Sequence, residues 1–364
     1  MQTTVAVFFG GKSNEHEISI ITGVYAANLL RGAGYRVLPV FLPREGGMAY
    51  ADANTVKAFT DGSVKLVPVY LNGSALFSQK KRKKLFAFDC ALNCCHGGMG
   101  EDGTLSALFR WNGVRSASPE TPISALFMDK SFGKIAAKGL AIPVARAVTV
   151  REGENAEAAM AAEGLTFPVI VKPVKLGSSI GVRVAHDEKE LADALALAFR
   201  LDTGALVEEY FRDKRDVNCA AYRKDGRIIA SECEEVFTDS AILSFEDKYE
   251  KAAKHSELPA DLPREISDKI RACTTWIYEA FDGRGVVRAD FIVAGGEAYF
   301  NELNTVPGSL ATYLFGESLT EAKKFLSALV EEALLRGGEE KETVVTGILN
   351  SDVFRGGKGS KRRG

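Results

Sequence analysis

The first 120 residues alternate apolar runs with amphipathic stretches. TVAVFFGG and YRVLPVFL are short apolar runs typical of buried strands, and FDCALNCCHGG is another. Between the first two lies EISIITGVYAANLLRGAG, which has the spacing of an amphipathic helix closed by glycine. This alternation predicts an α/β region with an open, mostly parallel sheet. Ligands bind at the carboxyl ends of strands in such sheets, so Gly10-Gly11 and Gly97-Gly98 mark candidate binding positions.

The rest of the chain changes character twice. Residues 121–212 combine helical segments with two strands around a Gly/Ser loop, which predicts a small α+β unit. Strands dominate residues 213–336, and the long polar stretch 238–263 within them is predicted to be a lid. The polar segment 337–364 is expected to be a mobile tail. The pattern therefore predicts three domains, 1–120, 121–212 and 213–336.

Composition excludes several classes of protein. The chain has 364 residues, 46% hydrophobic and 26% charged, with a formal net charge of −2. We therefore expect neither a nucleic acid nor a membrane as partner. No apolar run approaches the roughly 20 residues that span a bilayer, and the N-terminal apolar run is expected to be a strand and not a signal peptide. The six cysteines show no repeated spacing, so we expect reduced thiols in a cytoplasmic protein without zinc.

The segment GVVRADFIVAGGEAYFNELN predicts a hairpin that turns at Gly295-Gly296. A two-residue turn pairs Asp290 with Asn301, whereas a three-residue bulged loop pairs Asp290 with Glu302 and Arg288 with Asn304. In the second register all four polar side chains share one face. Opposed carboxylates repel unless a cation lies between them, and oxygen ligands suit Mg²⁺. The alternative is a solvated polar face.

A second candidate site is VIVKPVKLGSSIGV. Lys172 lies within an apolar strand and is followed by Gly177, Ser178, Ser179 and Gly181. Such a loop can direct backbone N–H groups at phosphate oxygens while the lysine adds a positive charge. It lacks the P-loop order of residues, and by itself it is also compatible with an ordinary hairpin.

Two further segments follow predicted strands. Ser13 opens a helix whose first turn includes Glu15 and Glu17, either of which could hold an ammonium group or simply favour the helix dipole. His96 ends a strand and Glu101 begins the next helix, among several glycines. This second segment is a binding loop or a capped turn.

Together these segments resemble the D-alanine–D-alanine ligase family of ATP-grasp enzymes. The shared motifs are GGKSNEHEIS, HGGMGEDGTLSALF, MDK, VIVKP, GSSIGV, DKY, RADF and NELNTVPG, over roughly residues 5–330. The resemblance implies an N-terminal parallel-sheet domain, with central and C-terminal domains that clamp ATP. It also implies ATP-dependent ligation of two D-alanines through an acyl phosphate for peptidoglycan synthesis, and a possible homodimer.

The resemblance also implies roles for individual residues. ATP is held by Lys130, Lys172, Gly177, Ser178, Ser179, Glu208, Asp216 and Lys248. Two Mg²⁺ ions, replaceable by Mn²⁺, are held by Asp290, Glu302 and Asn304. Catalysis involves Glu17, which takes the first ammonium, with Ser178 and Tyr249 beside it, and Arg288 and Gly308 at the oxyanion. The amino acid substrates contact Glu17, His96, Glu101, Tyr313 and Leu314.

One segment departs from the family pattern. After Pro-Gly the chain continues SLATYLF, which places Tyr313 where the family has a serine that binds the acceptor carboxylate, and Thr312 at the preceding histidine position. The alternatives are therefore a D-Ala–D-Ala ligase, a related ligase with another acceptor such as D-serine, and a nucleotide-binding regulator without turnover. Tyr249 matches dipeptide-forming members, which disfavours D-lactate.

Overall fold

The computed structural model describes residues 2–237, 256–336 and 344–347. Residues 1–334 form one compact unit and residues 335–364 a second. Lys248, Tyr249, most of the predicted lid and most of the predicted tail lie outside the described residues. None of the described helices combines the length and apolarity needed to cross a membrane.

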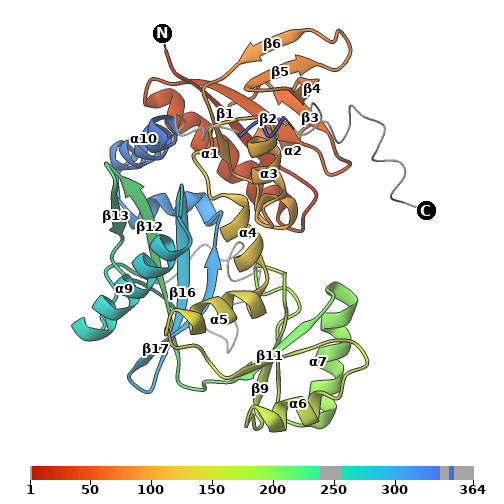
Figure 1. Ribbon diagram of the computed structural model, residues 1–364, viewed down its shortest axis with the longest axis vertical. Helices are drawn as coiled ribbons and strands as arrows, with labels where there is room; N and C mark the ends of the chain where they lie inside the picture. Colours follow the sequence, from red (N-terminus) through yellow and green to blue (C-terminus); the bar gives the residue numbers. More distant parts are fainter. Residues whose placement is uncertain (1, 238–255, 337–343, 348–364) are drawn as a thin grey trace. The chain divides into compact units, whose positions relative to one another are not determined.

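The N-terminal part contains a seven-stranded sheet in the order β6-β5-β4-β3-β2-β1-β7 (Figure 1). Its strands are β1 (Thr4–Gly10), β2 (Arg36–Leu42), β3 (Met48–Ala51), β4 (Leu66–Leu71), β5 (Ala75–Ser78), β6 (Lys84–Ala87) and β7 (Cys90–Asn93). Its helical segments are α1 (His16–Gly32), α2 (Lys57–Thr60), η1 (Gly98–Gly100) and α3 (Thr104–Trp111).

The expectation of a mostly parallel sheet is correct for only part of this sheet. Strand β1 pairs in parallel with β2 and β7, but β2 through β6 form an antiparallel meander. Connection length explains part of this, because α1 provides the parallel crossover from β1 to β2, whereas β2–β3, β4–β5 and β5–β6 are joined by short turns that require antiparallel pairing. Strands β1 and β7 are parallel neighbours, so their carboxyl ends, which the sequence marked as candidate binding positions, lie side by side.

A four-stranded antiparallel sheet follows, in the order β10-β9-β11-β8. Its strands are β8 (Ala147–Val150), β9 (Val169–Pro173), β10 (Arg183–Ala185) and β11 (Ala205–Glu209). Helices α6 (Ala156–Ala162) and α7 (Glu188–Leu201) pack on it around a core that includes Val171, Leu191 and Val207.

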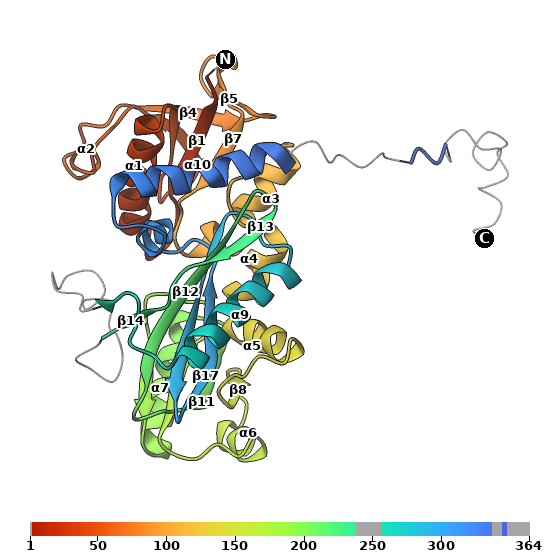
Figure 2. The same ribbon diagram turned by 90° about the vertical axis from the view of Figure 1, so that its left-hand side faces the viewer.

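The third sheet contains six strands, β15-β14-β12-β16-β17 with β13 beside β12, and lies between the other two sheets (Figures 1 and 2). Its strands are β12 (Arg215–Lys224), β13 (Arg227–Ala230), β14 (Glu234–Val236), β15 (Ser256–Glu257), β16 (Val286–Ala294) and β17 (Glu297–Asn304). Its helical neighbours are α4 (Thr121–Met128), α5 (Lys130–Gly139) and α9 (Arg264–Ala280), with η2 (Gly308–Leu314) and α10 (Leu319–Arg336) after it.

Packing crosses two of the domain boundaries that the sequence suggested. Ile123 and Phe127 of α4 join the core of the third sheet with Phe300, although they precede the four-stranded sheet in the chain. Phe325 and Leu329 of α10 join the core around α1 and β1. The boundaries near residues 120 and 212 stay predictions, because α4 and α10 each pack on the core of a different predicted domain from their own.

Candidate active site

All three sheets contribute to one cavity of about 600 Å³. The first sheet's loops supply Glu15, His96 and Glu101, the second sheet supplies Lys172 and Glu208, and the third supplies Asp216, Arg288, Asp290, Glu302 and Asn304. Its wall also includes Lys130, Gly177, Ser178, Ser179, Gly308 and Tyr313. Most of the site residues chosen from the sequence therefore converge on one space.

The hairpin β16–β17 forms one wall of the cavity. Its strands pair in the second of the two registers that the sequence allowed. Asp290 pairs with Glu302 and Arg288 with Asn304. The turn at Gly295-Gly296 is nevertheless the two-residue kind, since Ala294 pairs with Glu297. The extra residue is Asn301, a β-bulge in mid-strand and not at the turn.

The bulge concentrates polar groups on the cavity side of β17. Asn301 and the residue after it both line the cavity instead of alternating between faces. Lys172 Nζ donates to Asn301 Oδ1 at 2.9 Å, which links the second sheet to the third. The sequence did not identify Asn301 as a cavity residue, because both predicted registers set the strand pairing by the length of the turn and neither included a bulge within the strand.

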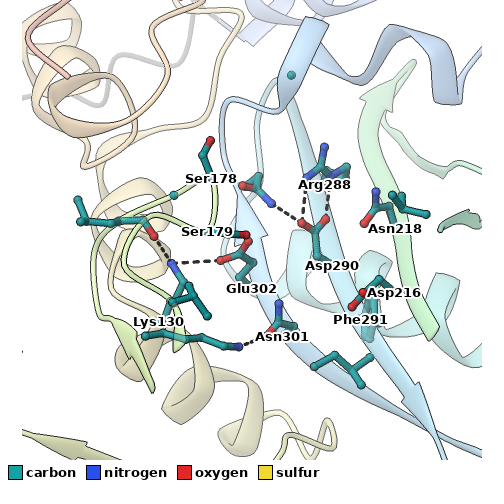
Figure 3. Close-up of a pocket in the computed structure, with 18 of the residues that line it drawn as sticks. Lys130, Ser178, Ser179, Asp216, Asn218, Arg288, Asp290, Phe291, Asn301 and Glu302 are labelled. Carbon is teal, nitrogen blue, oxygen red and sulfur yellow. Dashed lines mark hydrogen bonds and ion pairs between the residues drawn. The ribbon is translucent and has the colours of Figure 1, made fainter. Parts of the chain in front are cut away.

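The carboxylates of this wall have cationic and amide partners (Figure 3). Arg288 Nε and Nη2 lie 2.7 and 2.9 Å from the two oxygens of Asp290, and Asn304 Nδ2 donates to Asp290 Oδ2 at 2.9 Å. Lys130 Nζ lies 3.2 Å from Glu302 Oε2. Burial opposes the charge of Arg288, but Asp290 raises the pKa of its guanidinium above the usual value.

A buried ion group lies deeper in the cavity. Glu208 on β11 contacts Lys172 on β9 and Lys134 on α5, the latter at 2.5 Å. Burial works against ionisation of Glu208, yet the two ammonium groups hold its pKa at about 2. Lys134 was not among the residues chosen from the sequence, although it lies one helical turn after Lys130 on the same face of α5.

The Gly/Ser loop after β9 faces the hairpin wall (Figure 3). Ser178 and Ser179 have left-handed backbone angles, φ of 53° and 58°, which curl the chain as a phosphate-binding turn requires. Lys130 Nζ donates to Leu176 O at 2.6 Å and so ties α5 to the loop. Asp216 lies across the cavity, paired with Lys214.

Glu15, and not Glu17, faces the cavity from the first sheet. Ser178 Oγ donates a hydrogen bond to Glu15 Oε1, and Glu15 is 9% exposed. Glu17 points to solvent, with a side chain 68% exposed and an ion pair to Arg44 at 2.5 Å. The expectation that Glu17 faces the substrate is therefore wrong in its placement, because Glu15 is the acid of the two that lines the cavity. Helix geometry explains this, since Glu15, Ile18 and Thr22 line the cavity at i, i+3 and i+7.

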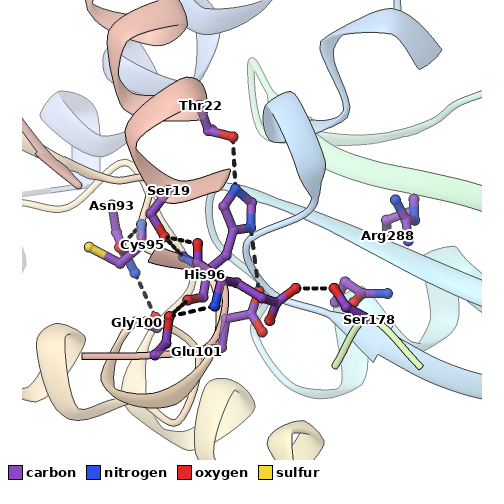
Figure 4. Close-up of polar contacts among 12 residues, drawn as sticks. Ser19, Thr22, Asn93, Cys95, His96, Gly100, Glu101, Ser178 and Arg288 are labelled. Carbon is purple, nitrogen blue, oxygen red and sulfur yellow. Dashed lines mark hydrogen bonds and ion pairs between the residues drawn. The ribbon is translucent and has the colours of Figure 1, made fainter. Parts of the chain in front are cut away.

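His96 and Glu101 line the same cavity as Glu15, and Figure 4 shows the contacts of these two residues. The His96 ring lies between two polar side chains. Its Nε2 is 2.8 Å from Thr22 Oγ1, and its Nδ1 is 3.8 Å from Glu101 Oε1. Ser19 Oγ accepts from the His96 backbone N–H at 2.8 Å. Burial, with the nearby charge of Glu15, raises the pKa of Glu101 against the effect of His96.

The segment after the hairpin is tightly wound. Ser309, Leu310 and Ala311 of η2 all have φ between 50° and 53°, a left-handed arrangement that costs non-glycine residues about 1–2 kcal/mol each. Burial of Leu310 and Ala311 holds it in place. Gly308 and Tyr313 face the cavity, whereas the side chain of Leu314 packs in the core around α1, so it is not a substrate contact.

Family comparisons agree with this arrangement. The model for the D-ala D-ala ligase N-terminus matches residues 4–118, and that for the D-ala D-ala ligase C-terminus matches residues 136–335. This chain belongs to the D-alanine–D-alanine ligase family. The family consists of ATP-dependent, ADP-forming ligases, and its ATP-grasp fold is the one described above.

Individual relatives cover most of the chain. The D-alanine–D-alanine ligase of Chlorobium luteolum is 36% identical over 324 residues, covering 84% of this chain and 89% of the relative. That of Campylobacter jejuni subsp. doylei is 31% identical over 337 residues, covering 91% and 94%.

Solved structures are similar over a comparable length. The D-alanine–D-alanine ligase of Helicobacter pylori has 28% identity and a TM-score of 0.75, covering 94% of this chain and 100% of that one. The VanG D-Ala:D-Ser ligase of Enterococcus faecalis has 27% identity and a TM-score of 0.76, covering 92% and 100%.

Proposed function

We propose that this chain joins two D-alanines to D-alanyl-D-alanine with ATP, through an acyl phosphate, for peptidoglycan precursor synthesis. The observation that supports this best is the composition of the cavity. Arg288, Asp290, Glu302 and Asn304 line one wall, and Lys130 lies opposite. Phosphoryl transfer to a carboxylate needs cations around the phosphoryl group and a donor for the later oxyanion.

The nucleotide fits the side of the cavity between the second and third sheets. Lys130 and Lys172 offer ammonium groups for the phosphates, and the turn at Ser178-Ser179 offers backbone N–H groups. In this orientation the adenine base would lie near Glu208 and the ribose near Asp216. Lys248, the further phosphate ligand suggested by the resemblance, lies outside the described residues and stays a prediction.

The donor set also fits a divalent cation. Asp290 and Glu302 are directly opposed in the hairpin, and the amide of Asn304 lies within hydrogen-bond distance of Asp290. Among the described residues no three or more His, Cys, Asp or Glu side chains cluster as a metal site, so phosphate oxygens would complete the ligand shell. Mg²⁺ held there would offset charge on the phosphoryl group. Two ions, with Mn²⁺ as a substitute, stay our proposal.

The first amino acid fits next to Glu15. Its ammonium would meet the Glu15 carboxylate, which Ser178 orients, and its carboxylate would extend toward the phosphates. Arg288 and the Gly308 backbone N–H then lie on the wall where an oxyanion would form. Tyr249, assigned with Ser178 from the resemblance, lies outside the described residues.

The test is product analysis. Purified protein with ATP, Mg²⁺ and D-Ala should release phosphate and ADP and form D-alanyl-D-alanine, identified by mass. No ADP formation with D-Ala, alone or with a panel of second amino acids, would contradict the ligase proposal and favour a regulator without turnover.

A ligase with another acceptor, such as D-serine, is the second candidate. Tyr313 occupies the cavity wall where the family has a serine, and a solved relative is named a D-Ala:D-Ser ligase. Faster mixed-dipeptide formation with D-serine than with D-Ala alone would favour it. A cytoplasmic location, near ATP, and a homodimer also remain proposals.

A further inference from the structure

Glu234 is a buried carboxylate that none of these roles uses. It is 6% exposed, begins β14 and lines the cavity. The strand register places Glu234 opposite Asn218, Asn218 opposite Asp290, and Asp290 opposite Glu302. Cross-strand partners share a face, so these four side chains form one row across the cavity floor. Figure 3 shows Asn218 and the two acids of the hairpin on this floor.

The hydrogen-bond partners of Glu234 are uncharged. Asn218 Nδ2 donates to Oε2 at 3.1 Å, and Tyr313 Oη donates to the same oxygen at 3.2 Å. Within the described ranges no hydrogen bond reaches Oε1 of Glu234. The two acids of the hairpin instead contact Arg288 or Lys130 directly. A buried carboxylate whose direct donors are neutral is costly even with the charge of Arg288 nearby, and a cation arriving in the cavity offsets that cost.

Glu15 has the same kind of environment on the other side of the cavity, where Ser178 Oγ donates to it. The proposed reaction brings in two amino acids, and each carries one ammonium group. Glu15 suits the first ammonium, which leaves the second one without a partner. Glu234 is a second buried acid whose hydrogen-bond donors are also neutral, and the hydroxyl of Tyr313 is one of them.

We propose that Glu234 binds the ammonium of the second amino acid and accepts its first proton, an inference that rests on the proposed ligase function. The nitrogen lone pair freed by that proton transfer forms the C–N bond to the acyl carbon. The C–O bond to phosphate then breaks and phosphate leaves with the electron pair. The second nitrogen proton passes to the departing phosphate or to solvent, which leaves a neutral amide.

Tyr313 is the positioning residue in this arrangement. Burial and the acid of Glu234, against the effect of Arg288, raise the pKa of the Tyr313 phenol to about 12, so it stays a donor at neutral pH. The charged groups that act on the phenol and on Glu234 from this side are Arg288 and Asp290, both of β16. Glu235 and Glu257, paired between β14 and β15, belong to the alternate positions of the strands, which face away from the row.

Hydroxylamine separates the two half-reactions. It is a small nucleophile, uncharged at neutral pH, that converts an acyl phosphate to a hydroxamate without an ammonium anchor. In Glu234→Gln we expect kcat/KM for the acceptor to fall about 10²-fold or more, while D-alanine hydroxamate formation with ATP and Mg²⁺ stays within about twofold. Raising the pH should restore part of dipeptide synthesis, because more of the acceptor is then free amine.

Glu235→Gln is the matched control. Glu235 is the next residue, is equally buried and bonds Arg215 on the other face of the strand, so acceptor kinetics per folded enzyme should not change. Tyr313→Phe keeps the ring but removes the hydrogen bond. It should raise the acceptor KM several-fold and leave hydroxamate formation intact, which provides a second test if Glu234→Gln does not fold.

Three results would overturn the inference. Unchanged acceptor kinetics in a folded Glu234→Gln or Tyr313→Phe variant would do so. Loss of hydroxamate together with dipeptide in folded Glu234→Gln would place the residue with ATP or the metal. If the wild-type protein forms no hydroxamate, the proposed ligase function itself is wrong. This outcome is separate from a failure of the Glu234 proposal, because it is seen before any variant is measured.

Discussion

The buried acid Glu208 leads to a quantitative prediction about stability. Its carboxylate is 1% exposed and contacts Lys134 and Lys172. Its pKa of about 2 lies below the ordinary value of 4.5. Each pKa unit corresponds to about 1.36 kcal/mol, so the charged form contributes about 3 kcal/mol to the free energy of unfolding.

The sign follows from which state binds the proton more tightly. Since the pKa is lower in the folded state, the stabilisation is complete above pH of about 4.5 and disappears as the pH falls toward about 2. Glu208→Gln removes it at every pH and leaves Lys134 and Lys172 buried without a counter-charge. We therefore expect a loss of about 3 kcal/mol at pH 7 and a smaller difference from wild type as the pH is lowered.

Urea unfolding without nucleotide, followed by fluorescence at several pH values where the wild type is folded, measures this difference. Glu209→Gln is the control, because Glu209 is the next residue and pairs with Arg146 near the surface. It should cost no more than about 1 kcal/mol. Adding Lys134→Met to Glu208→Gln should recover part of the loss. A difference from wild type that does not change with pH would refute the electrostatic explanation.

Three further substitutions test the site. Glu15→Gln should raise the KM for the first D-Ala by about tenfold or more, because a charged hydrogen bond is lost, while the KM of Glu17→Gln stays near wild type. A larger rise in Glu17→Gln than in Glu15→Gln would return the ammonium-binding role to Glu17. Arg288→Ala should lower kcat by about 10²–10³-fold with ATP still bound, since it removes an oxyanion donor, and an unchanged kcat would contradict that role. Glu302→Gln should shift the Mg²⁺ titration of activity to higher concentrations, and a normal titration would exclude Glu302 as a ligand.

The sequence predicted the family and the cavity better than it predicted individual positions. Motifs far apart in the chain did converge, because the carboxyl ends of β1 and β7 and the hairpin face one cavity. The antiparallel half of the first sheet was missed, since short apolar runs do not reveal their pairing direction. Glu17 was preferred to Glu15 on the resemblance, although the helical spacing to Ile18 and Thr22 favours Glu15.

The bulge at Asn301 shows what a closer inspection of the pattern could have found. The buried residues of β17 are Ala298, Phe300 and Leu303, so the spacing changes from two to three within one strand. A strand can keep its apolar side chains on one face across such a change only by inserting an extra residue. The sequence therefore contains the bulge, and with it the pairing of Asp290 with the acid opposite. What it does not contain is the partner of Asn301, because Lys172 reaches it from another sheet.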